Sequence, residues 1–559
     1  MGIAAGALIG GAFFLAVFGP GLLRPTNIGW LMRPDSQMYY LAFEHFRREP
    51  WHWPPGVIRG VGYPVGTSIG NSDAIPLAAF PLKAVHAWLP EPFQFLGWWL
   101  FACFVLQGAA GALVARQVTS DRRLQALTGA LFALSPALVH RVGHPALSAH
   151  WTIVGAVLLL MAGSLTPWRR FAAWALLTVV TAATNPYLTL MVLGLALCVV
   201  LNDLRAAPAP AAVTLALGRA AALLAAAAVV FWAIGIFIVR GSALRFGGFG
   251  VYSMNLLSPV IPLGYGRVLP PVPVVQEGQA EGFVYFGAGW LALALVAVGL
   301  RATRGRAWPR LGLAWLGVLA FTLLAVSPVV TAGSRVLADL RAWTPGVFDA
   351  VRSSGRFAWL PLYLAFVLIV RLALVHLRPG VALALLTGAI ALQVADLQGA
   401  YAGLYAREHS VAWTQYDNPL KSPVWDQAMG AHAHLVMAPP DMCGSVWPGP
   451  VGPHLPFSML AARHGATVNS GFSGRFDIGE IAAYCRVLQG DLAAARFADD
   501  TLYVVSAAER DALARTGAGA SLACGTLDGF TVCATPSGAA RWRQAARAAG
   551  IDLAALAAE

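Results

Sequence analysis

Two aspartates lie in the first long loop of the chain, in a setting suited to proton transfer. Asp35 follows Pro34 early in the loop and Asp73 lies further on, with tryptophan and tyrosine residues between them. Tryptophan and tyrosine favour the boundary between membrane and water. A carboxylate at that depth lies close to lipid-linked groups and can act as a general base towards a hydroxyl. Both aspartates are candidates for such a base, and the alternative for Asp35 is that it caps the following helix.

A later loop carries a pair of arginines suited to phosphate. Arg352 and Arg356 are four residues apart, so they share one face if the segment is helical. Two guanidiniums at the membrane edge suit bidentate binding of a phosphodiester. Ion pairing with Asp339 or Asp349 is the alternative. Other candidates for the phosphate are three arginines of an earlier loop: Arg240, Arg245 and Arg267.

Two further loops add polar and aromatic groups. Arg141, His144 and His150 lie between two apolar segments, where we expect them to hydrogen-bond to phosphate or sugar. The alternative is that they cap the ends of helices. Glu281 and Tyr285 suit sugar hydroxyls and ring faces, although Glu281 would equally pair with an arginine. Two histidines six residues apart lack a third ligand, so no metal is expected.

The composition places these loops in a membrane protein. Hydrophobic residues make up 58% of the 559 residues and charged residues only 11%, against about 25% charged in soluble domains. These values exclude a soluble globular protein, a disordered chain, a collagen-like fibre and a small disulfide scaffold. Eleven apolar segments are expected to span a bilayer, and 76–89 is a candidate short or re-entrant segment. The spans are predicted near 2–20, 95–117, 124–140, 150–166, 170–184, 186–201, 219–239, 286–300, 311–327, 357–375 and 380–397.

The loops between these segments alternate in character. Short basic loops alternate with long mixed loops at 21–94, 141–149, 240–285 and 328–356. Because cytoplasmic loops are enriched in Lys and Arg, the N-terminus is predicted to be cytoplasmic. The first apolar segment is expected to be retained as a span, since no Lys or Arg precedes it as in a signal peptide. An odd number of spans then puts the C-terminal part outside, in the periplasm. The formal net charge of +12 fits loops positioned against anionic lipid, and not a nucleic-acid partner. The amphipathic stretch Tyr39–Arg48 is expected to lie flat on the membrane surface.

The chain is predicted to have two domains. Residues 1–397 form a transmembrane domain that contains the long first outer loop, 21–94, and residues 398–559 form a soluble periplasmic α/β domain. Strand-like runs alternate with helical patterns in this part. The strands are expected at His434–Ala438, Thr467–Ser470, Thr501–Val505 and Gly529–Val532, and the helices at Phe457–His464, Asp477–Phe497 and Ala507–Arg515.

Four cysteines of this part suit an oxidising compartment. We favour the bonds Cys524–Cys533 and Cys443–Cys485, one of three possible pairings. Four buried thiols are the alternative. A zinc site is disfavoured because no Cys-x-x-Cys spacing occurs.

The layout resembles the GT-C class of polytopic glycosyltransferases, in a poorly characterised bacterial branch. The resemblance lies in a first span, a long outer loop with an early acidic residue, many spans and an exported C-terminal domain. The segments Arg141–Trp151 and Arg352–Phe357 also look like those of that branch. The resemblance implies that Asp35 is the base, with Asp73 the weaker candidate, and that the donor is a polyprenyl-phosphate-linked sugar. Many members carry a paired acidic motif, whereas Ser36 follows Asp35 here.

The expected function is therefore inverting transfer of a sugar on the outer face of the bacterial inner membrane, to a glycan, lipid or protein acceptor. No cofactor is expected, because the leaving phosphate departs already charged and nearby arginines stabilise it. A lipid-linked-sugar flippase or transporter, or a polysaccharide polymerase, is the first alternative. A non-enzymatic envelope scaffold or sensor is the second. The sequence lacks the Walker, Rossmann and His-Glu-x-x-His motifs of other enzyme classes.

Overall fold

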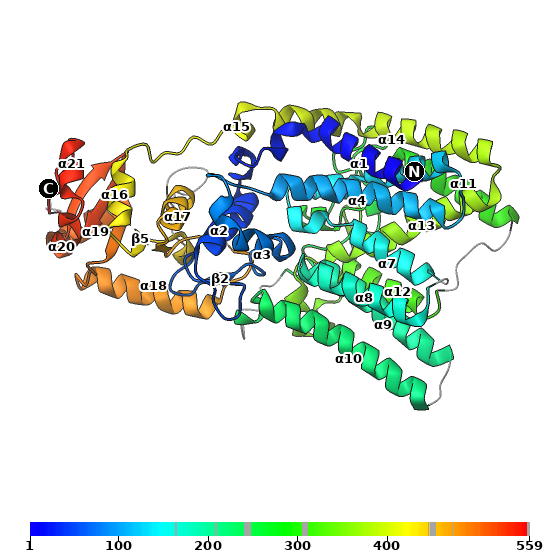
Figure 1. Ribbon diagram of the computed structural model, residues 1–559, viewed down its shortest axis with the longest axis horizontal. Coiled ribbons are helices and arrows are strands. Elements are labelled where there is room, and N and C mark those ends of the chain that lie inside the picture. The colour runs from blue at the N-terminus through cyan, green and yellow to red at the C-terminus, as the bar shows by residue number, and fades with distance from the viewer. Residues whose placement is uncertain are drawn as a thin grey trace. The chain divides into compact units, whose positions relative to one another are not determined.

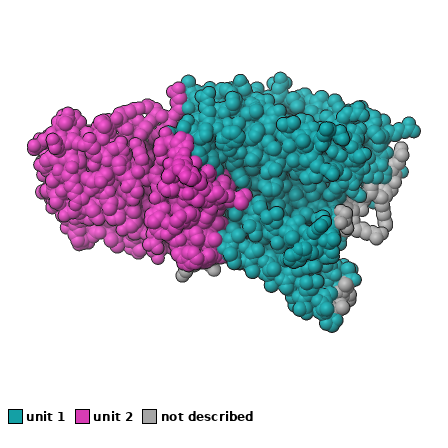
Figure 2. All heavy atoms as spheres, viewed as in Figure 1, with its two compact units in different colours: residues 1–27, 92–230, 245–414 teal, residues 28–91, 231–244, 415–559 magenta. Residues whose placement is uncertain are grey.

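The computed structural model of the protein describes residues 1–162, 165–206, 210–239, 248–304, 311–444, 447, 454–471 and 473–555. The chain divides into two compact units, which are coloured separately in Figure 2. Unit 1 comprises Met1–Asn27, Pro92–Val230 and Arg245–Thr414, and unit 2 comprises Ile28–Glu91, Phe231–Leu244 and Gln415–Glu559.

Unit 1 is a bundle of apolar helices (Figure 1). Glycines let its first helices approach closely: a Cβ at Gly6 would lie 2.7 Å from the carbonyl oxygen of Gly108, as is typical of membrane helix pairs. A two-stranded hairpin, β3 (Val329–Ala332) and β4 (Arg335–Asp339), interrupts the helices. The helices are α1 (Gly2–Phe18), α4 (Leu96–Arg116), α5 (Arg122–Ala133), α6 (Pro136–His140), α7 (Trp151–Met161), α8 (Pro167–Ala182), α9 (Pro186–Ala206), α10 (Pro210–Ala233), α11 (Ala288–Arg304), α12 (Ala314–Val326), α13 (Trp359–His376), α14 (Pro379–Glu408) and α15 (Val411–Thr414).

A helix lies at each of the eleven predicted apolar segments, and among the residues that the structure describes five helices are long and apolar enough to cross a membrane by length and composition. These five are Leu96–Arg116, Pro186–Ala206, Pro210–Ala233, Ser354–His376 and Pro379–Glu408. The segment predicted at 124–140 is two helices, α5 and α6, which break before Pro136. The break follows from proline, which lacks the N–H that a continuous helix needs and disfavours a helical residue before it. The number of spans therefore stays a prediction.

Unit 2 contains a five-stranded sheet flanked by helices. The strand order is β6-β5-β7-β9-β8; β5 pairs in parallel with β6 and β7, and β9 pairs antiparallel with β7 and β8. A small two-stranded sheet pairs β1 with β2. The strands are β1 (Val57–Ile58), β2 (Thr67–Ser68), β5 (His434–Ala438), β6 (Thr467–Val468), β7 (Thr501–Val505), β8 (Ala523–Leu527) and β9 (Phe530–Ala534). The helices are α2 (Pro34–Arg48), α3 (Pro76–Ala84), α16 (Val424–Gly430), α17 (His454–Arg463), α18 (Ile478–Ala493), α19 (Ala507–Thr516), α20 (Pro536–Ala540) and α21 (Arg543–Ala548).

The compact units divide the chain differently from the predicted domains. Most of the first long loop, Ile28–Glu91, belongs to the same unit as Gln415–Glu559. Long-range bonds explain this grouping. The backbone nitrogen of Tyr63 donates to the carbonyl oxygen of Val468 at 2.9 Å, and His45 Nε2 lies 3.1 Å from Ser458 Oγ.

The helix α2 corrects the prediction of a stretch lying flat on a membrane. Its residues from Ser36 to Arg47 are all buried, so no apolar face remains for lipid. Arg47 is 1% exposed and pairs with Glu44 at 2.8 Å and with Glu91 at 2.7 Å. The carboxylate of Glu91, 44 residues away in the sequence, neutralises the basic end that the pattern assigned to lipid phosphates.

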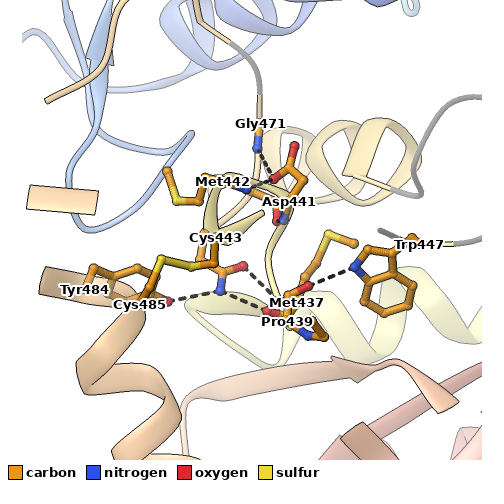
Figure 3. The surroundings of a disulfide bond; sticks show 11 residues. Met437, Pro439, Asp441, Met442, Cys443, Trp447, Gly471, Tyr484 and Cys485 are labelled. Carbon is orange, nitrogen blue, oxygen red and sulfur yellow. Dashed lines mark hydrogen bonds between the residues drawn. A yellow bond between two sulfur atoms is a disulfide. The ribbon is translucent and has the colours of Figure 1, made fainter. Parts of the chain in front are cut away.

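Two disulfides of unit 2 join Cys443 to Cys485 and Cys524 to Cys533. These are the pairs favoured from the sequence. The second bond links facing residues of β8 and β9. The first ties α18 to the turn after β5 (Figure 3). In that turn the carboxylate of Asp441 accepts hydrogen bonds from the backbone nitrogens of Met442 and Gly471, at 2.9 and 3.1 Å.

Candidate active site

Three predicted site residues of unit 1 meet at one carboxylate. Arg141 Nη1 lies 2.9 Å from Glu281 Oε2, and Arg356 Nε donates to the same oxygen at 2.7 Å. Arg141 Nη2 also donates to the carbonyl oxygens of Ala280 and Glu281, at 2.9 and 3.0 Å. We call Arg141, Glu281 and Arg356 the arginine–glutamate cluster. It joins three loops that are far apart in the sequence.

Short local elements position the cluster. Arg141 follows the five-residue helix α6, Glu281 lies in the 3₁₀ turn Glu277–Gly282, and Arg356 lies in the 3₁₀ turn Ser354–Ala358. The last two turns pack at glycines, because a Cβ at Gly355 would lie 2.7 Å from the Cα of Gly282. A larger residue at Gly355 would push Arg356 away from Glu281.

The charges of the cluster do not balance. Burial opposes ionisation of Glu281, but the charges of Arg141 and Arg356 and the hydrogen bond from Arg356 hold its pKa well below the ordinary value. The positive field of His144 acts in the same direction on that pKa. Two guanidiniums therefore share one ionised carboxylate, and the formal charges of these three side chains sum to +1. Such a site favours an anion of the size of a phosphate.

Aromatic rings pack against both arginines of the cluster. The guanidinium of Arg141 lies 5.2 Å from the ring centroid of Trp359, and that of Arg356 lies 4.8 Å from the centroid of Tyr187. Cations at these distances are attracted by the ring faces. His150 stacks against Trp359 with a centroid distance of 4.4 Å. The rings hold both guanidiniums in place without neutralising their charge.

Three buried polar atoms around Trp359 lack a hydrogen-bond partner in the part of the chain that the structure describes. They are Arg141 Nε, His150 Nε2 and Trp359 Nε1. Buried polar groups in proteins are normally satisfied by protein or by ordered water. Unsatisfied atoms next to the net positive charge are consistent with a ligand or water that completes the site.

Arg352 does not bind Glu281, and His150, which stacks on Trp359, has its hydrogen bond with another residue of unit 1. Arg352 Nη2 donates to the hydroxyl of Tyr252 at 2.6 Å, and its guanidinium lies 4.6 Å from that ring. The backbone here is a sequence of 3₁₀ turns and not one α-helix, so a spacing of four does not place Arg352 and Arg356 on one face. Arg352 also does not pair with Asp339, which binds Arg341 at 2.6 Å. His150 Nδ1 lies 2.8 Å from the hydroxyl of Tyr363.

Tyr285 has a structural role in place of the expected contact with sugar. It is fully buried, and its hydroxyl donates to Asp396 at 2.7 Å. Asp396 also accepts hydrogen bonds from the backbone nitrogens of Arg267, Val268 and Ala288. Sequence reasoning missed Asp396, although a carboxylate inside the apolar segment 380–397 was a visible signal. Arg240 and Arg245, the other predicted phosphate candidates, lie outside the described residues.

Asp35 and Asp73 belong to unit 2. Asp35 lies in the first turn of α2 and is exposed, while the N-cap residue is Arg33. The capping alternative is therefore wrong: Pro34 takes the first helical position, which suits its fixed φ and missing N–H. Asp73 has a φ of 50° and Ile75 a φ of 52°. A β-branched residue in the left-handed region is strained, and such strain concentrates at functional sites.

The described residues contain no group of three His, Cys, Asp or Glu side chains arranged to hold a metal ion. A small cavity of about 240 Å³ lies in unit 1 between Tyr265 and Arg407. Its side chains are already engaged: His140 Nδ1 lies 3.2 Å from the Tyr265 hydroxyl, and Arg407 binds Glu408 at 2.7 Å. The arginine–glutamate cluster is the stronger candidate for a binding site.

Comparisons with known proteins give a family without an assigned activity. Residues 7–398 match a family described as "Domain of unknown function (DUF6311)", and residues 424–535 match the "DUF6311 C-terminal domain". No curated protein matches the chain. Among solved structures, the chain is similar to an archaeal oligosaccharyltransferase, AglB from Archaeoglobus fulgidus, in complex with an inhibitory peptide and a dolichol-phosphate. The identity is 12% and the TM-score 0.42, over 95% of this chain and 74% of that one. A likeness of this strength supports no argument about the fold or the activity.

Proposed function

The chain belongs to the DUF6311 family, and from its own residues we propose that it is a membrane glycosyltransferase. The donor is a polyprenyl-phosphate-linked sugar, and the acceptor is a glycan, a lipid or a protein. The reaction takes place at the outer face of the bacterial inner membrane, with the sheet-containing part of unit 2 in the periplasm. The proposal rests mainly on one observation: Arg141 and Arg356 share a single carboxylate oxygen of Glu281.

That observation favours binding of a phosphate. The cluster carries one more positive than negative charge, and its side chains are from 2% to 18% exposed. In a partly buried site a charge-assisted hydrogen bond is stronger than one exposed to water. A donor phosphate would accept hydrogen bonds from Arg356 and from the unsatisfied Nε of Arg141, while Glu281 keeps both guanidiniums in position.

The chemistry needs a base and a stabilised leaving group. In the proposed reaction the Asp35 carboxylate accepts the proton of an acceptor hydroxyl, and the hydroxyl oxygen attacks the anomeric carbon of the donor. The bond between that carbon and the phosphate oxygen breaks, with inversion at the carbon. The pair of electrons leaves with the polyprenyl phosphate, which departs already charged.

Binding of polyprenyl phosphate to the purified protein tests the phosphate site. Arg356→Ala should weaken the affinity about tenfold or more, because a charge-assisted hydrogen bond contributes about 1.5–3 kcal/mol. Arg356→Lys should restore only part of the affinity, since an ammonium cannot reproduce the guanidinium fork. Arg352→Ala should weaken binding less, because Arg352 binds Tyr252 and not Glu281.

Two controls make this result specific. Arg341→Ala removes an exposed guanidinium of unit 1 that is paired with Asp339, and it should leave the affinity unchanged. Polyprenol, which has the same chain without phosphate, should bind wild type and Arg356→Ala alike. An unchanged affinity for polyprenyl phosphate in a double Arg352→Ala, Arg356→Ala variant would rule out this phosphate site.

A further inference from the structure

An apolar groove lies on unit 1, and none of its described lining residues belongs to the arginine–glutamate cluster. It has a volume of about 650 Å³ and is lined by α4, α7 and α8, whose ribbons lie near one another in Figure 1. The lining is almost wholly aliphatic, with residues such as Leu113, Leu158, Leu176 and Val180. Its lining residues include no carboxylate. The groove therefore suits a hydrocarbon chain and not a polar ligand.

One end of the groove is basic. Arg116 and Gln117, at the end of α4, line the groove there together with Ala162 and Leu165. Arg116 is exposed, and so is Arg169 at the start of α8. Within the described part of the chain neither arginine has a carboxylate partner. The neighbouring Asp203 is already shared by Arg170 and Arg219, at 2.6 and 3.7 Å.

The opposite end is aromatic, and the distance between the ends is limited. Trp151, the first residue of α7, lines that end. The helix α7 has 11 residues, which at about 1.5 Å per residue gives a length of about 16 Å. The hydrocarbon core of a bilayer is about 30 Å thick, so the groove matches the depth of one leaflet. A carbon group of an acyl chain is about as large as a water molecule, which occupies about 30 Å³. The volume of the groove therefore holds on the order of 20 carbon groups, about as many as one long acyl chain contains.

We propose that this groove binds one acyl chain of an anionic glycerophospholipid, with the phosphate against Arg116. The basic end supplies the charge complementarity and the aliphatic walls supply the affinity, at about 0.8 kcal/mol for each buried CH₂. An isoprenoid chain of a sugar donor is longer than one leaflet and fits this groove less well. Trp168 lies next to Arg169, at the basic end of the groove, and is 70% exposed. Tryptophan residues are common at the level of the lipid headgroups. This site does not depend on the proposed glycosyl transfer.

Gly155 offers a direct way to fill the groove. It lies in the middle of α7, and a Cβ built there would meet only Leu177 Cδ2, at 3.8 Å. Gly155→Leu therefore adds a side chain to the groove without a backbone clash. Gly388→Leu is the matched control, because Gly388 is exposed on α14 and a Cβ there meets nothing within 4 Å. Both substitutions replace a helical glycine by a good helix former, so they should not differ in helix stability.

Native mass spectrometry of the purified full-length protein, with added phosphatidylglycerol or phosphatidylcholine, tests the proposal. Wild type and Gly388→Leu should retain one phosphatidylglycerol after collisional activation, and Gly155→Leu should lose it. Arg116→Gln should weaken retention of phosphatidylglycerol about tenfold or more, while Arg205→Gln, an exposed arginine at the end of α9, should not. Phosphatidylcholine should be retained poorly by every variant.

Three results would overturn the proposal. The first is retention of phosphatidylglycerol by Gly155→Leu at the wild-type level, and the second is equal retention of both phospholipids by wild type. The third is retention of polyprenyl phosphate, but not phosphatidylglycerol, in a manner sensitive to Gly155→Leu, which would assign the groove to the donor. Failure of the donor to bind at Arg356 would leave all these expectations unchanged.

Discussion

The arginine–glutamate cluster is a partly buried ion-pair group of two positive charges and one negative charge, and this composition supports the functional argument at the scale of residues. A buried ion pair is weak evidence for stability, since desolvation offsets much of the attraction. The arrangement is better explained as a site that an anion completes.

Glu281→Gln tests the balance of charge in this group. Removing one partner of a buried ion pair costs about 3–5 kcal/mol, so the variant should unfold at a lower temperature in detergent. Protonation of Glu281 should have the same effect. Because the pKa of Glu281 is lowered in the folded state, the ionised carboxylate stabilises the fold at any pH above the ordinary carboxyl pKa. This stabilisation is lost only as the pH falls well below that ordinary value. Polyprenyl phosphate should restore part of the lost stability, since a ligand that binds only the folded state stabilises it.

Glu277→Gln is the control for that measurement. Glu277 lies in the same 3₁₀ turn but is exposed. The unfolding temperature of the Glu277→Gln variant should therefore match that of wild type. An equal loss in both variants would attribute the effect to the turn and not to the ion pairs.

At the scale of elements, a buried histidine of α2 joins this helix to α17, which lies in the same unit. His45 is 1% exposed, and its Nε2 lies 3.1 Å from both oxygens of Ser458 on α17. Burial lowers the pKa of His45 to about 4, although Glu49 and the bond to Ser458 oppose this effect. His45 is therefore neutral at physiological pH, and its side chain holds α2 against α17.

This buried histidine predicts a pH dependence of stability. The unfolded chain takes up a proton near pH 6.5 while the folded chain does so only near pH 4. Stability is therefore full above pH 6.5 and is lost as the pH falls towards 4, by about 3 kcal/mol in all. Thermal unfolding between these pH values should show this loss in wild type and a smaller one in His45→Gln. His86→Gln, at an exposed histidine, should keep the wild-type slope, and a slope unchanged in His45→Gln would refute the assignment.

The disulfide that joins β8 to β9 gives a second prediction at the scale of elements. Non-reducing peptide mapping of protein purified without reductant should find Cys524 linked to Cys533. The residues are nine apart, so the bond should stabilise the chain at the low end of about 2–4 kcal/mol. Its loss in a Cys524→Ser, Cys533→Ser variant should lower the unfolding temperature and leave membrane insertion intact. Free thiols at both positions in wild type would refute the prediction.

The elements show how far the sequence predicts this structure. Apolar runs located the helices of unit 1 because such runs form helices in a membrane whatever surrounds them. The break at Pro136 was readable from proline alone. The burial of α2 was not, because Arg47 finds Glu91 only through the tertiary fold. The strand β8 (Ala523–Leu527) was not predicted either, since short strands acquire their identity from the partners beside them.

The candidate site shows a similar limit. The types of Arg141, Glu281 and Arg356 suggested phosphate and sugar chemistry, but sequence reasoning paired Arg356 with Arg352. The spacing rule behind that pairing holds for an α-helix, and the chain forms 3₁₀ turns there. The meeting of three loops at one oxygen of Glu281 depends on helix packing that no local pattern encodes.

At the scale of the whole molecule, the alternation of short basic loops with long mixed ones predicts the topology. Reporter fusions after residue 414, beyond α14 and α15, should be active outside the cytoplasm. Fusions near Arg301, at the end of α11, should report the cytoplasm. A cytoplasmic C-terminus would overturn the odd number of spans, the periplasmic assignment and the compartment argument for the disulfides.

Turnover of a polyprenyl-phosphate-linked sugar by the purified protein, with membrane extract as the source of acceptor, tests the central claim most directly. Asp35→Asn keeps the size of the side chain and disturbs no cap, because the N-cap of α2 is Arg33. If Asp35 is the base, the variant should fold normally and lose about 10²–10⁴-fold in the rate of transfer, while Asp73→Asn keeps the wild-type rate. Loss in Asp73→Asn alone would move the base to Asp73. Wild-type rates in both variants, or no transfer by the wild-type protein with any polyprenyl-phosphate sugar, would contradict the assignment of this chain as a glycosyltransferase.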